Sequence, residues 1–82
     1  MSVSKERREA YGKFTILKYF HYDHLPKHLQ EVSKPFNDLA YSIADRFIDG
    51  KAPDIAETIS SLRKLLESKD CAVRASIMPK GN

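Results

Sequence analysis

Two long stretches of the chain repeat apolar residues at steps of three and four, and a turn-forming segment separates them. The first stretch carries Leu29, Val32, Phe36, Leu39, Ala40, Ile43 and Phe47, and the second carries Ile55, Ile59, Leu62, Leu66, Val73 and Ile77. This spacing places each set on one face of an α-helix. The segment DGKAPD lies between them. The pattern therefore predicts an all-α fold built on an antiparallel two-helix hairpin.

We predict the first long helix at residues 26–49. Asp23 is the expected cap, and Pro26 suits the first turn because its missing N–H has no partner there. Gly50 suits a left-handed C-terminal cap. Pro35 lies inside the helix, so either the helix kinks there or a short helix ends just before it and a longer one begins at it. The unbroken apolar stripe favours a kink.

The second long helix is predicted at residues 54–78. Asp54 stands three residues before Glu57, which is the spacing of a capping box. The tail PKGN is expected to end this helix, because its proline and glycine are poor helix formers.

Residues 1–22 precede the long helices and form an N-terminal arm. Residues 2–13 are polar and charged, and they allow either a short helix, capped by Ser4 and ended by Gly12, or a disordered tail. Residues 14–22, FTILKYFHY, are aromatic and β-branched, which predicts an extended conformation. No second segment offers a strand partner, so we expect an extended segment lying on the helices or on a neighbouring subunit.

The small size of the chain predicts association of copies. It has 82 residues, which we assign to a single domain, and a domain this small buries only about 60% of its unfolded surface. Its one cysteine, Cys71, cannot form an internal disulfide. Two striped helices leave apolar rows that the arm covers only in part, so we expect a homo-oligomer.

Composition and charge exclude several classes of protein. The charged N-terminus lacks the apolar run of a signal peptide, and no stretch approaches the roughly 20 apolar residues that span a bilayer. A lone cysteine suits a reducing compartment. We therefore expect a cytoplasmic protein with no membrane partner. The net charge of +3 is carried by dispersed basic residues, which argues against a duplex DNA partner.

The sequence gives no support to catalysis or to metal binding. It contains no glycine-rich phosphate loop, no GxSxG and no HExxH. His21, His24 and His28 cluster, but Pro26 breaks the helical face that the last two would share, so we expect no metal site. Cys71 lies mid-helix beside a carboxylate, which is a poor setting for a catalytic thiol. We predict a protein that is not an enzyme and needs no cofactor.

The arm mixes aromatic and basic side chains. They are Tyr11, Phe14, Tyr19, Phe20 and Tyr22, with Lys13 and Lys18 between them. Aromatic faces stack on nucleobases, and nearby cations meet phosphate. The alternative is that these rings pack on the helices. A phenol keeps one end in water, so Tyr19 and Tyr22 are better candidates for ligand contact than Phe14 and Phe20.

Three segments, FHYDHLP, LQEVSKPFNDLAYSI and SLRKLLESKDCAVRASI, resemble a family of small phage proteins. That family is the anti-CBASS cyclic-oligonucleotide sponges, whose helical hairpin is shared with the Thoeris-antagonist sponges. It carries an arm with an aromatic-x-Tyr and proline motif, a D/E-L-A step in the first helix and a closing A/S-L-x-K-L-x-E helix. The resemblance covers about residues 20–78. The chain departs from it at Pro35, where many relatives carry a polar helix former, and at Asp70 and Cys71, where a bulky apolar pair is common.

The resemblance implies an immune-evasion protein that acts in the cytoplasm of the infected bacterium. Such sponges sequester cyclic di- and trinucleotide messengers without cleaving them, and they assemble into oligomers, often hexamers, with ligands held between subunits. The resemblance places Tyr22 on a base, with Tyr19 as the alternative, and Lys34 on a phosphate. For a second pocket that takes trinucleotides it implies Arg74 and, less directly, Ser76.

Two other functions remain open from the residues alone. The hairpin could dock a partner helix in its apolar groove, as helix-in-groove binders do. It could also bind single-stranded nucleic acid weakly through the aromatic and basic arm.

Overall fold

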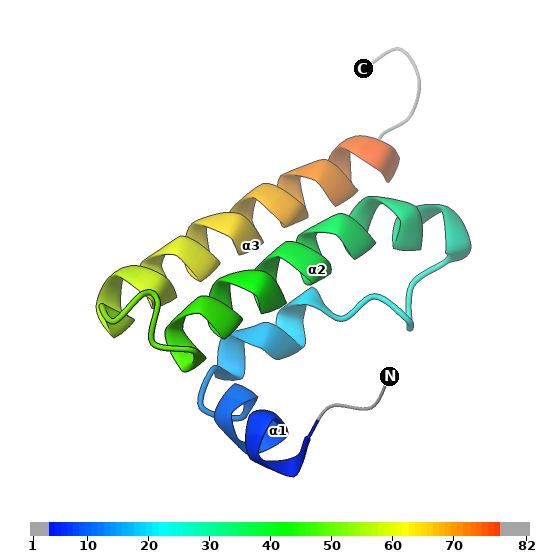
Figure 1. Ribbon diagram of the computed structural model, residues 1–82. Helices are drawn as coiled ribbons and strands as arrows, with labels where there is room; N and C mark the ends of the chain where they lie inside the picture. Colours follow the sequence, from blue (N-terminus) through cyan, green and yellow to red (C-terminus); the bar gives the residue numbers. More distant parts are fainter. Residues whose placement is uncertain (1–3, 78–82) are drawn as a thin grey trace.

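The computed structural model describes residues 4–77, and all regular structure in that range is helical. Helix α1 spans Lys5–Tyr11 and the 3-10 helix η1 spans Thr15–Phe20, while the long helices α2 and α3 span Lys27–Ile48 and Ile55–Ile77. The two long helices lie side by side and run in opposite directions (Figure 1). The predicted all-α class and the two long helices are confirmed.

The turn between α2 and α3 follows the predicted chemistry. Gly50 has a φ of +77°, which is the left-handed conformation that glycine adopts without strain. Asp54 caps α3, because one of its carboxylate oxygens accepts the backbone N–H of Glu57 at 3.0 Å. The helix therefore begins one residue after the predicted start, at Ile55. The predicted end at residue 78 lies outside the described residues.

The start of α2 differs from its prediction. Asp23 does not cap the helix, which begins at Lys27 with Pro26 in the capping position and without a side-chain cap. The Gln30 side-chain amide instead donates to the backbone carbonyl of Leu25 at 2.9 Å. This bond returns from the first turn of the helix and ties down the loop that leads into it.

Helix α2 continues through Pro35 without a break, so the alternative of two separate helices is wrong. Proline removes one backbone donor, which leaves the carbonyl of Glu31 without its helical partner. Both residues are exposed, so water reaches that carbonyl. Ser33 and Ala40, on either side of the proline, are both buried and keep one face of the helix toward the interior.

Of the two alternatives for residues 2–13, the short helix is correct for the part that the structure describes. The Ser4 hydroxyl oxygen accepts the backbone N–H of Arg7 at 3.1 Å, and Gly12 forms the C-cap. No residue of α1 is fully buried. Its position on the rest of the fold therefore depends on polar contacts and on the partly buried ring of Tyr11.

The extended conformation predicted for residues 14–22 is wrong, because Thr15–Phe20 form a 3-10 helix. Phe14, Leu17 and Phe20 recur every third residue, which is the period of a 3-10 turn. All three fall on one side and are buried, with exposed fractions of 4%, 3% and 0%. The composition of this segment fits a strand. The segment nevertheless forms a 3-10 helix, because that conformation buries the three apolar residues that recur at every third position.

The core lies where η1 packs against both long helices (Figure 1). The buried cluster consists of Phe14, Leu17, Phe20, Ala40, Ala44 and Leu62. The ring of Phe14 also meets Phe47 edge-on, with centroids 5.7 Å apart. The arm therefore covers part of the apolar surface of the two long helices, as expected, and it does so through the packing of η1.

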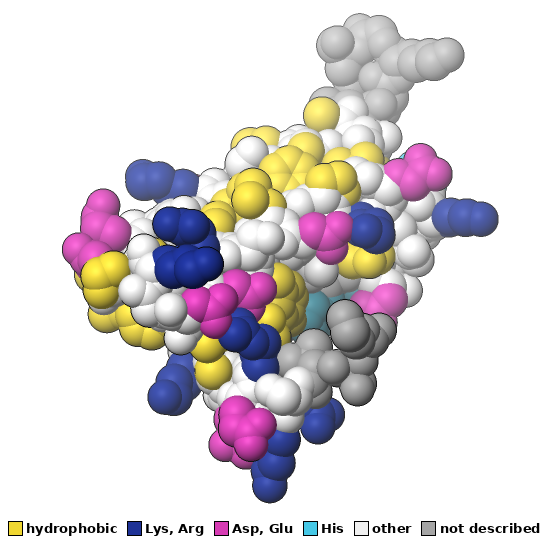
Figure 2. All heavy atoms as spheres, viewed as in Figure 1, with side chains coloured by type: hydrophobic (Ala, Val, Ile, Leu, Met, Phe, Trp, Pro, Cys, Tyr) yellow, Lys and Arg dark blue, Asp and Glu magenta, His cyan; other side chains and the backbone are white. Residues whose placement is uncertain are grey.

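Other apolar side chains remain exposed. Leu39 is 50% exposed, Ile55 42% and Ile77 56%. Figure 2 shows hydrophobic side chains gathered over the two long helices. Within residues 4–77, no helix is both long and apolar enough to cross a membrane.

Candidate functional site

Helix α1 is fastened to α2 through two carboxylates. The Arg7 guanidinium donates to Asp45 at 2.6 Å and also pairs with Asp49. The Tyr11 hydroxyl donates to the same oxygen of Asp45, again at 2.6 Å. Asp45 and Asp49 stand one turn apart on α2 and so face the same side. The contacts of Arg7 with Asp49, Tyr11 and Asp45 raise the pKa of its guanidinium.

Tyr41 of α2 lies between two aromatic residues of the arm. The ring of Tyr11 meets it edge-on, with centroids 4.9 Å apart. On the other side the His21 ring lies parallel to it at 6.3 Å, and His21 Nε2 is 3.0 Å from the Tyr41 hydroxyl. Burial raises the pKa of Tyr41, and burial followed by the hydrogen bond to Asp45 raises that of Tyr11.

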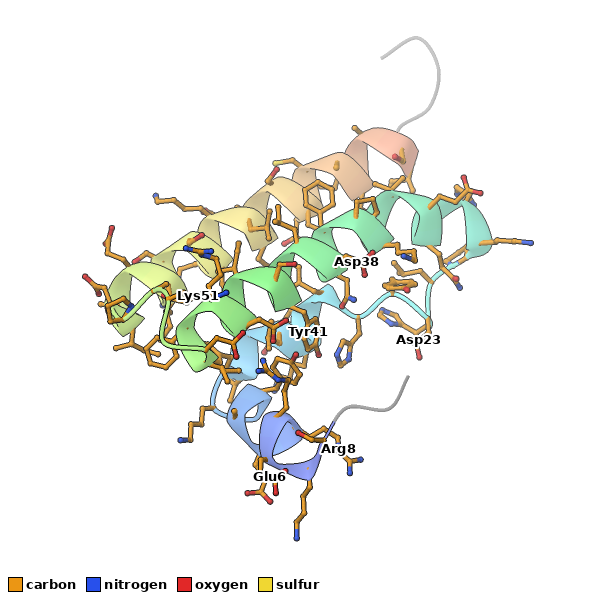
Figure 3. The ribbon with its side chains drawn as sticks, viewed as in Figure 1. Glu6, Arg8, Asp23, Asp38, Tyr41 and Lys51 are labelled. Atoms are coloured by element: carbon orange, nitrogen blue, oxygen red, sulfur yellow. The ribbon has the colours of Figure 1, made fainter. Side chains whose placement is uncertain are left out.

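Two surface hollows adjoin at this point. The first, of about 700 Å³, is lined by Arg8, Tyr11, Asn37, Asp38, Tyr41, Ser42 and Asp45. The second, of about 430 Å³, is lined by His21, Tyr22, Asp23, Asn37 and Tyr41. They share Asn37 and Tyr41, so we describe them together as the tyrosine hollow. Figure 3 shows Tyr41 and Asp38 on α2, with Arg8 of α1 and Asp23 of the loop before α2 below that helix in this view. Small-molecule sites typically measure about 300–1,000 Å³.

The α2 side of the tyrosine hollow comes from one flank of the helix. It includes Asn37, Asp38, Tyr41 and Asp45, which follow Lys34 at steps of three, four or their sums. The Lys34 ammonium pairs with Asp38 at 2.8 Å, and both side chains are more than half exposed. Arg7 neutralises Asp45 in the same way. Each carboxylate of this flank therefore has a cation beside it.

Of the two residues predicted to contact one nucleotide, Tyr22 lines the hollow and Lys34 does not. Lys34 lies one turn before Asn37 on the same flank of α2. Its pKa is raised first by its hydrogen bond to Asp38 and the charge of that residue, and then by the charge of Tyr22.

The alternative aromatic, Tyr19, lies elsewhere. It is 57% exposed, and the Lys18 ammonium stands 5.3 Å from the centre of its ring. In a 3-10 helix whose positions 17 and 20 point inward, position 19 points outward. Tyr19 lines neither part of the tyrosine hollow.

Arg74 and Ser76 lie near the C-terminal end of α3 and line neither part of the hollow. The Arg74 guanidinium approaches the Cys71 sulfur at 3.3 Å, and the Ser76 hydroxyl donates to the carbonyl of Ala72 at 3.0 Å. Their implied role in a second pocket stays a prediction.

Six residues that line the hollow were not singled out from the sequence: Arg8, Asn37, Asp38, Tyr41, Ser42 and Asp45. Arg8 makes none of the ion pairs found within residues 4–77, so its guanidinium is available to an anion. Asn37 and Tyr41 stand at the junction of the two parts. Their three- and four-residue spacing after Lys34 was a usable signal, because it places them on the flank of that lysine.

No group of three or more His, Cys, Asp or Glu residues in the described part of the chain is arranged to hold a metal ion. No protein-family model, curated protein or solved structure matches the chain. Function is therefore inferred from the tyrosine hollow and from the sequence resemblance.

Proposed function

We propose that this chain is a phage immune-evasion protein that sequesters cyclic di- and trinucleotide messengers of the host without cleaving them. The observation that carries the proposal is the hollow that Tyr22 and Tyr41 line, with the cationic Arg8 lining its adjoining part. A stacking ring next to a cation is the combination that recognises a nucleobase joined to a phosphate.

Aromatic side chains supply the base-binding part of the proposed site. Tyr22 and Tyr41 line the same side of the hollow, with His21 parallel to Tyr41. Stacking of a base on an aromatic ring contributes about 1–3 kcal/mol and accepts any base, because every base has a π-face. In our proposal Tyr22 stacks on one base of the ligand.

Two cations supply the phosphate-binding part. Arg8 lines one part of the hollow, and Lys34 lies one turn before Asn37 on the flank of α2 that lines it. Lys34 must leave Asp38 to meet a phosphate, and exposed ion pairs of this kind contribute little to stability. The carboxylates at the rim each have a cation, so they oppose an anionic ligand less than bare acids would.

The proposal includes assembly of the helical hairpin into a homo-oligomer, with a hexamer expected from the resemblance. The exposed Leu39, Ile55 and Ile77 support association, because large apolar side chains left in water favour burial against another chain. Ligands would then lie at seams between copies, with Arg74 and Ser76 in the second class of pocket. The proposed setting is the cytoplasm of an infected bacterium.

Calorimetric titration with a panel of cyclic di- and trinucleotides tests the proposal. The wild-type protein should bind at least one of them, and Tyr22→Ala should weaken binding by about ten-fold or more, in line with a lost stacking contact. Tyr19→Ala is the matched control and should change affinity by less than about two-fold. Absence of binding to every member of the panel contradicts the proposal.

A second candidate function is the docking of a partner helix. The exposed Leu39 and Ile77 favour it, because such grooves hold apolar side chains of an amphipathic helix. This function predicts no change in melting temperature with cyclic nucleotides, whereas a ligand that binds only the folded state must raise it.

A further inference from the structure

Asn37 has an unusual place in the tyrosine hollow. It is one of the two residues that line both parts. Its side-chain oxygen Oδ1 is sealed from solvent and has no hydrogen-bond donor within the described residues. A buried acceptor without a donor destabilises the folded chain, because it has lost water and gained no partner. Within residues 4–77 the only other such atom is the hydroxyl of Ser33, which does not line the hollow.

The two ends of the Asn37 amide have different surroundings. Its N–H group lies close enough to Asp38 to help lower the pKa of that carboxyl, after the larger effect of Lys34. The oxygen is the end left without a partner. The last torsion of an asparagine side chain is broad, so a modest rotation turns this oxygen into the hollow that the side chain already lines.

The rest of the first hollow is rich in acceptors. Asp38, Ser42 and Asp45 contribute oxygen atoms to its lining beside the ring of Tyr41. A base held against Tyr41 therefore meets oxygen atoms at its edge. A base with an amino group at that edge can donate a hydrogen bond to them. A base with only a carbonyl there places its acceptor oxygen against the acceptor oxygens of the protein, and no hydrogen bond forms.

We propose that Asn37 is the base-reading residue of this site, and that its Oδ1 accepts a hydrogen bond from the exocyclic amino group of a purine. This inference rests on the proposed function. It deepens that function by assigning the ligand class as cyclic nucleotides that carry adenine or guanine. Hypoxanthine is a purine without an exocyclic amino group, so a cyclic dinucleotide that carries it serves as the control ligand that should bind weakly.

The test compares cyclic di-AMP, cyclic di-GMP and cyclic di-IMP by calorimetry. Wild-type protein should bind the better of the two amino-purine ligands at least about ten-fold more tightly than cyclic di-IMP, because loss of a donor leaves a buried acceptor unpaired. In Asn37→Leu this ratio should fall to less than about two-fold. In Asn37→Asp, which keeps an acceptor, the ratio should persist even where overall affinity drops.

A second measurement separates a reading role from a structural one. Without ligand, Asn37→Leu should melt at or above the wild-type temperature, because it removes an unpaired buried acceptor. If the wild-type protein binds all three ligands equally, or if Asn37→Leu keeps the preference, the inference about Asn37 is overturned while the proposed function stands. If none of the three binds, and no other member of the panel does, the proposed function itself fails.

Discussion

The Tyr11 hydroxyl donates a 2.6 Å hydrogen bond to Asp45, 34 positions away in the sequence. Arg7 pairs with the same carboxylate oxygen. Because α1 buries no residue completely, these contacts and the packing of the Tyr11 ring on Tyr41 hold it on α2. They also bring Tyr11 and Arg8 to the tyrosine hollow, so the structure of the site depends on them.

Removal of Arg7 should release α1. In Arg7→Ala both ion pairs to α2 are lost, and only the Tyr11 hydroxyl still ties α1 to Asp45. We expect the nuclear Overhauser contacts between the rings of Tyr11 and Tyr41 to weaken or vanish, with a small drop in melting temperature. Lys5→Ala, in the same helix, is the control and should preserve these contacts. Unchanged ring contacts in Arg7→Ala would show that α1 is held by something else.

Stability should fall above about pH 10, and Tyr11 should contribute to the fall. The folded protein raises the pKa of Tyr11 from its ordinary value of 10.0, so it favours the neutral phenol. That stabilisation is complete below the unfolded pKa and is lost as the pH rises through the folded one. Thermal melts between pH 8 and 11 should therefore show a shallower alkaline decline in Tyr11→Phe than in the wild type. Identical declines would mean that the phenol of Tyr11 is not perturbed.

Leu62 should be essential to the core. It is 0% exposed and packs with η1 and α2 in the central cluster. Leu62→Ala should lower the free energy of unfolding by about 2–5 kcal/mol, which is the range for large-to-small changes in a core. Its exposed neighbour on α3, Arg63, provides the control, and Arg63→Ala should stay within about 0.5 kcal/mol. Chemical denaturation measures both, and similar small effects would contradict the assigned core.

Association of copies should depend on exposed apolar side chains. Leu39 is 50% exposed on α2. If copies cover it, Leu39→Glu places a charge in a seam and should lower the mass found by light scattering, with helical content unchanged. The exposed Lys64, changed to Glu, should leave the mass unaltered. A monomeric wild-type protein at micromolar concentration would remove the argument for shared sites.

The sequence was sufficient to predict the long helices because local rules and burial agree there. Apolar spacing of three and four defines their inner faces, Gly50 adopts the predicted left-handed conformation, and Asp54 caps α3. The segment after Phe14 was mispredicted because its β-branched and aromatic residues fit a strand. The recurrence of apolar residues at every third position indicated the 3-10 helix more reliably, since Leu17 and Phe20 are buried in the core against the long helices.

The site was only partly predictable. Tyr22 and Lys34 entered through the resemblance, and the structure places Tyr22 in the lining of the hollow and Lys34 outside it. The contact between Tyr11 and Asp45 joins elements far apart in the chain, and no local sequence pattern indicates such a pair. The burial of the Asn37 side-chain oxygen also cannot be deduced from spacing, because it depends on how the chain packs around that flank of α2.

The most direct test of the account follows the fate of a bound nucleotide. The protein is mixed with the cyclic dinucleotide that it binds best, passed through gel filtration, heated to unfold it, and the released nucleotide is identified by mass spectrometry. The account predicts that the nucleotide elutes with the protein and is recovered with its mass unchanged. A nucleotide that elutes separately, or that returns as a linear product, would contradict it.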